Sequence, residues 1–385
     1  MSTAPNTPAF GRHVVTAVLV AHNGARWLPQ SAAGLLAQTR PPQEFVAVDT
    51  GSTDDSADLL GQLLGADRVV AAPLGTGFGA AVDLGLAATD QASAEAHPPP
   101  DDDRSDSDQP VQWLWLLHDD AEPEPHALEH LLRHVDSSPT VAVAGPKLRG
   151  WSNRRTLLEV GVTIARSGRR ETGLERREQD QGQHDGIHDV LAVSTAGMLV
   201  RRDVWDALGG LDPVLSLYRD DVDFGWRVNS AGHRVVCVTD AVVHHAEAAS
   251  HGRRTLGAFS ERYLRVDRQH ANYVLLANLP LLLVPLAGLR LIVGTLLRAL
   301  GLLVGKLPAN AMGELLALGS VLARPDRLAR ARWRRRRTRV VPYRDVRRLL
   351  ASPSSSLRRG MEPVTAGVGV GAAASFAAGR HRRRR

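Results

Sequence analysis

Two adjacent aspartates end a strongly apolar segment of the chain. Asp119 and Asp120 follow the run VQWLWLL (111–117) and His118. Neighbouring carboxylates repel each other unless a cation lies near both, and hard oxygen ligands suit Mg²⁺ or Mn²⁺. A single aspartate here would be interpreted as a cap for the helix that starts near Pro125. Two aspartates beside a histidine instead favour a divalent-cation site.

A second acidic cluster lies further along the chain, in YRDDVDFGWRV (218–228). Asp220, Asp221 and Asp223 fall within four positions, next to a helical segment. A carboxylate in a pocket beside an acidic neighbour has a raised pKa, which makes it a usable general base. The alternative is structural, because acidic residues stabilise the first turn of a helix through its dipole.

A pair of histidines lies at the end of another predicted strand. The segment HRVVCVTDAVVHH (233–245) alternates in its apolar content and ends at His244 and His245, which add a candidate nitrogen ligand to the same metal site. Cys237, inside this strand, is expected to be a core thiol rather than a catalytic one. The chain has one cysteine, so it has no disulfide framework, and this suits a reducing compartment.

Elements with alternating strand and helix signals must position these residues. Predicted strands cover 13–24, which ends in a turn, 44–52, 67–73 and 111–117, and predicted helices cover 25–39, 53–65, 79–88 and 124–135. Such alternation predicts an α/β sheet with helices on both faces. Ligands of open sheets bind outside the carboxyl ends of the strands. The segments VAHNG, VDTGSTD and HDDAEP follow three of these strands, so we expect them to meet in one site.

Residues 91–110 differ in composition from the segments on either side. The stretch QASAEAHPPPDDDRSDSDQP is rich in proline and acidic residues and has almost no apolar content. We expect a disordered surface loop inserted before the strand at 111–117, not a domain boundary.

Charge is distributed unequally along the chain. After residue 250 there are 27 Lys and Arg against 6 Asp and Glu, whereas residues 1–250 hold 20 against 35. A basic segment can bind nucleic acid, but this one includes a long apolar stretch. That neighbour favours an anionic membrane surface as the partner.

The apolar stretch begins with 16 residues, 274–289, that carry no charge. This is short of the roughly 20 residues that span a bilayer as one straight helix. Pro280 and Pro285 would kink the segment, and Arg290 and Arg298 interrupt the apolar residues after it. We therefore expect a membrane-embedded or interfacial hairpin over 274–306. The alternative is a buried helical pair that covers the catalytic domain. The N-terminus lacks the apolar region of a secretion signal.

Seven segments, in this order, resemble a family two glycosyltransferase of the kind related to rhamnosyl- and galactofuranosyltransferases. They are VAHNGARWLPQSAAGLLAQT, VDTGSTDDS, GTGFGAAVDLGL, LLHDDAEPEP, STAGMLVRRDVWDALGGLDP, DDVDFGWR and VVHHAEAAS, and they cover residues 13 to about 255. The resemblance implies a GT-A fold, which is an α/β fold with a mixed, mostly parallel sheet. It also implies inverting transfer from a nucleoside diphosphate sugar.

The resemblance implies a role for each cluster around the donor. HDD matches the metal motif, so Asp120 would bind a divalent cation, Mg or Mn, that bridges the diphosphate. His118 stands where the commonest form of this metal motif has an aspartate, while Asp119 remains available as a carboxylate. His244, in preference to His245, matches a histidine that completes the metal site. The residues implied in nucleotide-sugar binding are Ala21, His22, Asn23, Asp49, Gly77, Gly79 and Asp119.

The resemblance also implies a single displacement. Asp221 would be the catalytic base that takes the proton from the acceptor hydroxyl, and the cation would stabilise the departing diphosphate. Asp220, Trp226 and Arg227 would form the acceptor side. Core packing is the alternative for Trp226, and an ion pair with a neighbouring carboxylate is expected for Arg227.

These inferences give an expected organisation. Residues 1–11 form a flexible N-terminus, 12–255 the GT-A domain, 256–330 a membrane-associated helical region and 331–385 a basic, partly disordered tail. The expected partners are a nucleoside diphosphate sugar, a glycan or lipid-linked acceptor of the cell envelope, and an anionic membrane surface, with no nucleic acid. The expected location is the cytoplasmic face of the cell membrane.

Two other functions compete with this one. A nucleic-acid-binding protein would use the arginine-rich C-terminal third. An oxidoreductase would use GTGFGA (75–80) as a dinucleotide fingerprint, but that motif comes late in the chain and lacks a following strand with a ribose-binding acid. Neither function accounts for HDD, DDVD and HH together.

Overall fold

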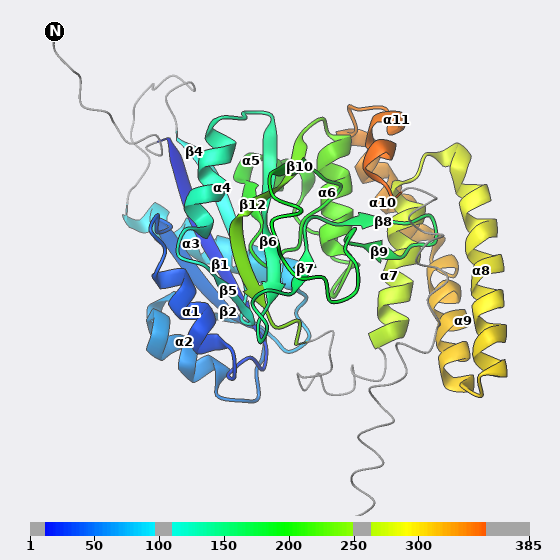
Figure 1. Cartoon of the computed structure of the whole chain (residues 1–385), viewed down its shortest axis with the longest axis horizontal. Coiled ribbons are helices and arrows are strands. Elements are labelled where there is room, and N and C mark those ends of the chain that lie inside the picture. Colours follow the sequence, from blue (N-terminus) through cyan, green and yellow to red (C-terminus); the bar gives the residue numbers. More distant parts are fainter. Residues whose placement is uncertain (1–11, 97–109, 249–262, 352–385) are drawn as a thin grey trace, which may run out of the picture. The chain divides into compact units, whose positions relative to one another are not determined.

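The structure is a computed structural model, and it describes residues 12–96, 110–248 and 263–351 (Figure 1). Its main sheet has the strand order β10-β12-β6-β11-β4-β1-β2-β3, with β5 beside β12 and β7 beside β6. The strands are β1 His13–Ala21, β2 Glu44–Asp49, β3 Val69–Ala71, β4 Val111–His118, β5 Ala121–Pro123, β6 Val141–Gly150, β7 Leu157–Glu159, β10 Ile187–Asp189, β11 Leu199–Arg201 and β12 Arg234–His245. A separate small sheet pairs β8 (Thr163–Ile164) with β9 (Arg170–Glu171).

Helices cover both faces of this sheet, because the strands are apolar on both sides. Val15 and Leu19 of β1 share one core cluster with side chains of α1, α2 and α4, whereas Val18 and Val20 share another with side chains of α3, α5 and α6. The helices are α1 Leu28–Leu36, α2 Ser56–Leu64, α3 Phe78–Ala96, α4 Ala127–Asp136, α5 Arg202–Leu208 and α6 Asp220–Ser230. The α/β fold predicted from the sequence is confirmed.

The strand register brings the polar strand ends together. β1 lies parallel to β2 and β4, with Ala21 opposite Asp49 and Val20 opposite His118. β11 is antiparallel to both β4 and β6, which makes the sheet mixed. The segments after β1, β2 and β4 therefore leave the sheet at the same edge.

The long strand β12 brings the histidine pair to that edge. It runs parallel to β6 and antiparallel to the short β5, where His245 lies opposite Ala121. Cys237 is fully buried in this strand, and burial raises the pKa of its thiol to about 12. A thiol with so high a pKa is inert at neutral pH, which agrees with the expected core role.

The insert predicted over 91–110 begins later than expected. Residues 91–96 continue α3, where the Gln91 side chain donates a hydrogen bond of 2.9 Å to Glu95 one turn on. Alanine, glutamine and glutamate favour a helix, and this preference extends α3 beyond the predicted boundary. The rest of the insert, 97–109, lies outside the described residues, as do residues 1–11 and the predicted boundary at 255.

The C-terminal region forms helices that pack on the catalytic domain. They are α7 Tyr263–Asn278, α8 Val284–Val304, α9 Pro308–Leu322, α10 Pro325–Thr338 and the short α11 Tyr343–Val346. Val274, Leu275 and Leu276 of α7 are buried in one cluster with Val222 and Trp226 of α6. The apolar run at 274–289 is therefore divided, because its first part belongs to the core of the protein.

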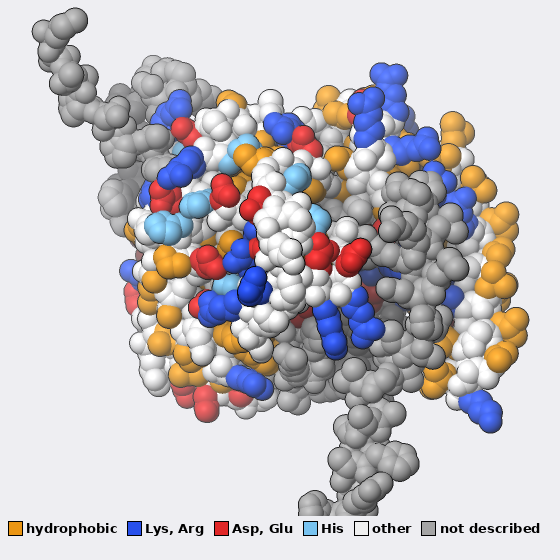
Figure 2. All heavy atoms as spheres, viewed as in Figure 1, with side chains coloured by type: hydrophobic (Ala, Val, Ile, Leu, Met, Phe, Trp, Pro, Cys, Tyr) orange, Lys and Arg blue, Asp and Glu red, His pale blue; other side chains and the backbone are white. Residues whose placement is uncertain are grey.

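Helices α8 and α9 lie side by side as an antiparallel hairpin (Figure 1). Leu291, Thr295 and Ala299 of α8 are buried, one turn apart, so one stripe of the helix faces the protein. Many of its other apolar side chains are exposed, and they appear as a row along the edge of the molecule in Figure 2. These exposed residues are Leu286, Leu289, Ile292, Val293, Leu296, Leu297, Leu300, Leu303 and Val304.

The segment Leu281–Val304 is long and apolar enough to cross a membrane, as judged by length and composition, and 11% of its most apolar window is buried. Arg298 does not face outward freely, because its guanidinium donates to Glu314 of α9 at 2.9 Å. Arg268 of α7 donates to the same carboxylate at 3.1 Å. The carboxylate of Glu314 therefore links α7, α8 and α9.

A buried polar network attaches α10 to α6. Asp223 of α6 is fully buried and accepts hydrogen bonds of 2.7 Å from Arg335 of α10, Asn278 of α7 and Arg227 of α6. Arg335 also donates to Asp212 at 2.8 Å. The predicted boundary at 330 cuts through α10. Residues 331–338 are helical because α10 packs on the domain, so the basic tail does not begin there; residues 352–385 lie outside the described part.

Candidate active site

The loop after β1 is fixed by a buried carboxylate from the end of β4. The His22 backbone N–H donates to Asp119 Oδ2 at 2.8 Å, and the Asp119 side chain is almost fully buried. A Cβ atom added to Gly24 would lie 2.0 Å from the same oxygen, so this close approach requires glycine. Asp119 therefore positions the turn that follows Ala21.

The loops after β1 and β2 are joined by side-chain hydrogen bonds. Asn23 adopts a positive φ of 50°, and its Oδ1 accepts a hydrogen bond of 2.7 Å from the Thr53 backbone N–H. Asp49 Oδ2 accepts from the backbone N–H groups of Gly51 and Ser52 at 3.2 and 3.1 Å. Its other oxygen is buried and has no hydrogen-bond partner among the described residues. A buried oxygen of this kind is suited to accept an N–H or O–H from a ligand.

Three side chains converge beyond β4 and β12 in an arrangement that fits a metal ion. One ligand atom from each of His118, Asp120 and His245 lies within 4.8 Å of the other two. Asp120 Oδ1 is 3.2 Å from His245 Nε2 and 4.0 Å from His118 Nδ1. Asp120 Oδ2 accepts the backbone N–H of Ala248 at 2.8 Å, which fixes the carboxylate. Two imidazoles and one carboxylate form a donor set that can hold a divalent metal ion.

The geometry favours His245 over His244, the histidine that the resemblance implied as a ligand. Successive residues of a strand point to opposite faces, so the two histidines diverge. His244 Nε2 lies 2.9 Å from Glu124 Oε1. This hydrogen bond and the charge of His244 both lower the pKa of Glu124, although burial of Glu124 opposes them. His245 instead faces Asp120. Burial opposes protonation of His245, but the Asp120 carboxylate raises its pKa.

Asp220 and Asp221 lie in the first turn of α6, and a half-buried arginine holds the second of them. Arg170 of β9 donates to Asp221 Oδ2 at 2.6 Å and forms a bidentate pair with Glu159 of β7 at 2.6 and 3.0 Å. The adjacent Asp220 is also buried. Burial and the neighbouring Asp221 charge raise the pKa of Asp220 to about 7.

Long-range charge effects link this pair to the cluster of His118, Asp120 and His245. Glu159 pairs with Arg170, and its charge, together with the larger effect of Asp120, raises the pKa of His245 against burial. The sequence analysis missed Glu159 and Arg170, since each lies in a two- or three-residue strand with no motif around it. Long-range packing, and not local pattern, brings them to α6.

Two residues predicted for the acceptor side, Trp226 and Arg227, contact the protein interior. Trp226 is fully buried in the cluster shared by α6 and α7, so it lies in the core, as the alternative interpretation held. It is too enclosed to contact an acceptor. Arg227 donates to Asp223 at 2.7 Å and to the carbonyls of Leu208 and Gly210 at 3.0 and 2.7 Å. The expected ion pair of Arg227 is confirmed.

The glycine-rich segment before α3 packs against the loop that leads to α6. A Cβ atom on Gly77 would lie 2.9 Å from Ser216, and one on Gly79 would lie 2.8 Å from Leu211. Close packing on residues 211–216 is a structural reason for glycine at both positions. The role of Gly77 and Gly79 in nucleotide-sugar binding stays a prediction.

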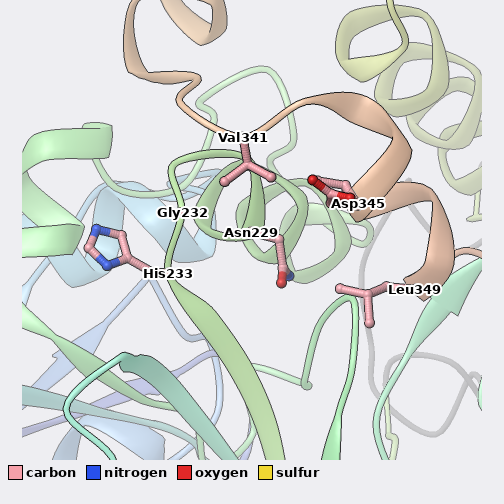
Figure 3. Close-up of a pocket in the computed structure, with 7 residues that line it drawn as sticks. Asn229, Gly232, His233, Val341, Asp345 and Leu349 are labelled. Carbon is pink, nitrogen blue, oxygen red and sulfur yellow. The ribbon is translucent and has the colours of Figure 1, made fainter.

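A separate cavity of about 180 Å³ lies at the far end of α6 (Figure 3). Asn229 comes from the end of that helix, His233 from the turn after it, and Val341, Asp345 and Leu349 from the C-terminal segment. At a rise of about 1.5 Å per residue, this end of α6 is well separated from Asp220. The cavity is therefore not part of the candidate site.

Two curated proteins are similar to parts of this chain. A 258-residue match, 26% identical, covers 62% of this chain and 78% of N-acetylglucosaminyl-diphospho-decaprenol L-rhamnosyltransferase from Mycobacterium tuberculosis. A second, 29% identical, covers 36% of this chain and 11% of the O-antigen biosynthesis protein RfbC of Myxococcus xanthus.

Solved glycosyltransferase structures were also found. S. aureus TarS 1-349 aligns over 90% of this chain and 92% of its own with 13% identity and a TM-score of 0.42. GalNAc-T7, crystallised with UDP, GalNAc and Mn²⁺, aligns over 69% of this chain and 50% of its own with 14% identity and a TM-score of 0.43.

The family model described as "Glycosyltransferase like family 2" matches residues 13–265. This match spans β1 to the start of α7, and so includes every strand-end segment of the site. The chain therefore belongs to glycosyltransferase family 2, whose members transfer sugars from activated nucleotide donors.

Proposed function

We propose that the protein is a metal-dependent, inverting glycosyltransferase that moves a sugar from a nucleoside diphosphate sugar to a hydroxyl of a lipid-linked envelope glycan. The observation that carries this proposal is the convergence of His118, Asp120 and His245 at one strand edge, linked through Glu159 and Arg170 to Asp221. A cation site and a carboxylate base on one cleft are what a single displacement requires.

In this proposal the nucleotide lies over the ends of β1 and β2. The unpartnered oxygen of Asp49 accepts a hydrogen bond from the nucleoside, while the turn Ala21 to Asn23, fixed by Asp119, forms the floor. His118, Asp120 and His245 would hold the cation, which supplies Lewis-acid stabilisation to the diphosphate leaving group. Mn²⁺ is the ion that we propose.

Asp221 remains our proposed base on geometric grounds. Its carboxylate lies in the first turn of α6, and Arg170, which also pairs with Glu159, fixes its orientation. Burial and the Asp221 charge raise the pKa of the adjacent Asp220 to about 7, so Asp220 can exchange a proton at neutral pH.

The C-terminal helices are proposed to bring this site to a membrane. The inner stripe of α8 packs on α9, so lipid cannot surround α8, whereas its outer leucines are exposed. We propose that the α8–α9 hairpin lies in the interface of an anionic bilayer at the cytoplasmic face. This position suits an acceptor whose lipid stays in the membrane.

The test is a donor screen with purified protein. Sugar release from UDP-, dTDP- and GDP-sugars is measured without acceptor, with Mn²⁺ or with EDTA. Slow hydrolysis of one donor in Mn²⁺ that stops in EDTA is expected. Full hydrolysis in EDTA would contradict metal dependence, and no hydrolysis or transfer with any donor would contradict the proposed function.

A further inference from the structure

A hollow lined by arginines lies between α10 and the loop that precedes α6. Its volume is about 440 Å³, and its lining residues are Pro213, Val214, Arg324, Arg327, Arg330 and Arg334. Arg327, Arg330 and Arg334 are three or four positions apart on α10, so their side chains project from one face of the helix. We call this hollow the arginine cleft.

The arginine cleft carries uncompensated positive charge. Asp326 forms ion pairs with Arg324 and Arg330. Arg327 and Arg334 form no ion pair within residues 12–96, 110–248 and 263–351. One carboxylate among four guanidinium groups leaves a net charge of +3 around the cleft. Like charges held this close repel each other, and an anion between them would relieve that repulsion.

The cleft is held in place by buried contacts. Arg335, next to Arg334, is buried and donates to Asp212 and Asp223 at 2.8 and 2.7 Å. Asp212 directly precedes Pro213, so the same carboxylate anchors the opposite wall. Both walls are thus fixed to the catalytic domain, and the arginines do not depend on a mobile tail for their position.

The cleft lies close to the proposed base along the chain. Val214 comes six residues before Asp220, so the two can be at most about 21 Å apart. The intervening segment is not extended, because Tyr218 and Arg219 adopt positive φ values of 62° and 69°, and this shortens the separation. The donor diphosphate belongs at the His118, Asp120 and His245 cluster. A second anionic group is therefore best assigned to the acceptor.

We propose that the arginine cleft binds the diphosphate of a lipid diphosphate-linked acceptor while a hydroxyl of its sugar reaches Asp221. This inference rests on the proposed function and adds the chemical class of the acceptor. Guanidinium groups bind phosphate oxygens through paired, charge-assisted hydrogen bonds. Exposed arginines at the rim and an apolar hairpin nearby fit a ligand with a charged head and a lipid chain.

The test compares two acceptors that carry the same sugar, one on a short-chain polyprenyl diphosphate and one on a neutral alkyl glycoside. The variant is Arg327→Gln with Arg334→Gln. The control is Arg336→Gln with Arg348→Gln, which removes the same charge from exposed arginines outside the cleft. KM, kcat and donor hydrolysis are measured for each protein.

For the cleft variant we expect KM of the diphosphate acceptor to rise at least about tenfold, with kcat, donor hydrolysis and KM of the neutral glycoside within about twofold of the wild type. The control should change none of these values. An equal rise of KM in the control, or no preference of the wild type for the diphosphate acceptor, would overturn the proposal.

Two further measurements separate the possible sources of the phosphate. If the cleft variant loses binding to phosphatidylglycerol vesicles but keeps its KM for the diphosphate acceptor, the arginines bind lipid headgroups and the proposal is wrong. Calorimetry with pyrophosphate in EDTA measures the cleft directly, and weaker binding in the cleft variant but not in the control is expected. This result stands even if no sugar is transferred, so failure of the cleft and failure of the proposed function are distinguishable.

Discussion

Asp220 and Asp221 share the first turn of α6, but Arg170 holds only Asp221 directly. Because burial and the Asp221 charge raise the pKa of Asp220 to about 7, the pair gains a proton as the pH falls below that value. We expect kcat to fall on the acid side of pH 7. Asp220→Asn should remove this inflection, since it removes the carboxyl group whose pKa lies near 7. A pH–rate profile that keeps its inflection near 7 in Asp220→Asn would exclude this origin.

Asp221→Asn keeps the size of the side chain but cannot take the acceptor proton. General-base catalysis contributes roughly 10²- to 10⁴-fold, so we expect kcat to fall by that order while donor affinity stays near wild type. Transfer at saturating donor and calorimetric donor binding provide the measurement. If Asp220→Asn is the inactive protein and Asp221→Asn is active, the roles of the two residues are reversed.

His244 and His245 provide a matched pair for the metal site. His245 faces Asp120, whereas His244 contacts Glu124 on the other side of β12. We expect His245→Ala to weaken Mn²⁺ binding at least about tenfold and His244→Ala to leave it close to wild type. Manganese titration followed by electron paramagnetic resonance measures both. If only His244→Ala weakens Mn²⁺ binding, His244 is the metal ligand, as the family resemblance implied.

Site residues could be predicted from the sequence where they belong to a short local motif. HDD and DDVD name the acidic residues, but the choice between adjacent histidines depends on which face of β12 each side chain occupies, and the sequence does not fix that register. Arg170 and Glu159 were missed because they reach α6 through short strands far from any motif. Trp226 belongs to the core because α7 covers it, and nothing local indicates this.

At the scale of elements, α6 joins the catalytic site to the C-terminal helices. Asp223 is fully buried among Arg227, Arg335 and Asn278, and, although burial opposes ionisation, the Arg335 and Arg227 charges lower its pKa to about 2. Because the pKa of Asp223 in the folded state lies below the usual value of 3.8, its ionised carboxylate stabilises the folded protein above pH 4. This stabilisation is lost as the pH falls toward 2. Acid should therefore loosen α10 from the domain.

Asp223→Asn leaves two buried guanidinium groups without their shared carboxylate. Loss of one partner in a buried ion pair costs about 3–5 kcal/mol, so we expect a marked fall in the free energy of unfolding at pH 7. Urea unfolding followed by circular dichroism measures it. Asp203→Asn, which breaks an exposed pair with Arg201, is the control and should change the midpoint little. Similar midpoints for both variants would contradict the role of the network.

Strands and helices up to residue 136, and the strand that ends at His245, were predictable because their hydrophobic periodicity is clear, whereas β6 to β11 between residues 141 and 201 were not predicted. The C-terminal elements were less so, since apolar composition does not distinguish α7, which is buried against α6, from α8, whose outer side is exposed. Similarly, the arginine-rich sequence of α10 is typical of a solvated tail. Asp212 and Asp223, both distant in sequence, make Arg335 a buried residue.

For the whole molecule, the unequal charge distribution has a structural counterpart. The acidic part contains the sheet and the site, and the basic part contains the exposed apolar side of α8 together with the arginine cleft. Leu289 and Leu296 of α8 are exposed by 59% and 55%, and burial of the exposed part of each in lipid contributes about 1 kcal/mol. We expect Leu289→Asp with Leu296→Asp to reduce partition into phosphatidylglycerol vesicles at least about tenfold.

The control for this prediction places the same two aspartates elsewhere. Leu36 and Leu84 are exposed by 52% and 41% on α1 and α3, so Leu36→Asp with Leu84→Asp adds equal charge without touching α8. Sedimentation with vesicles at low and high salt measures partition for each protein. Since salt screens the arginines but not apolar burial, wild type should lose part of its binding at high salt and the α8 variant nearly all of it. Equal loss in the α1–α3 control would show that added charge, and not the apolar side of α8, governs attachment to the membrane.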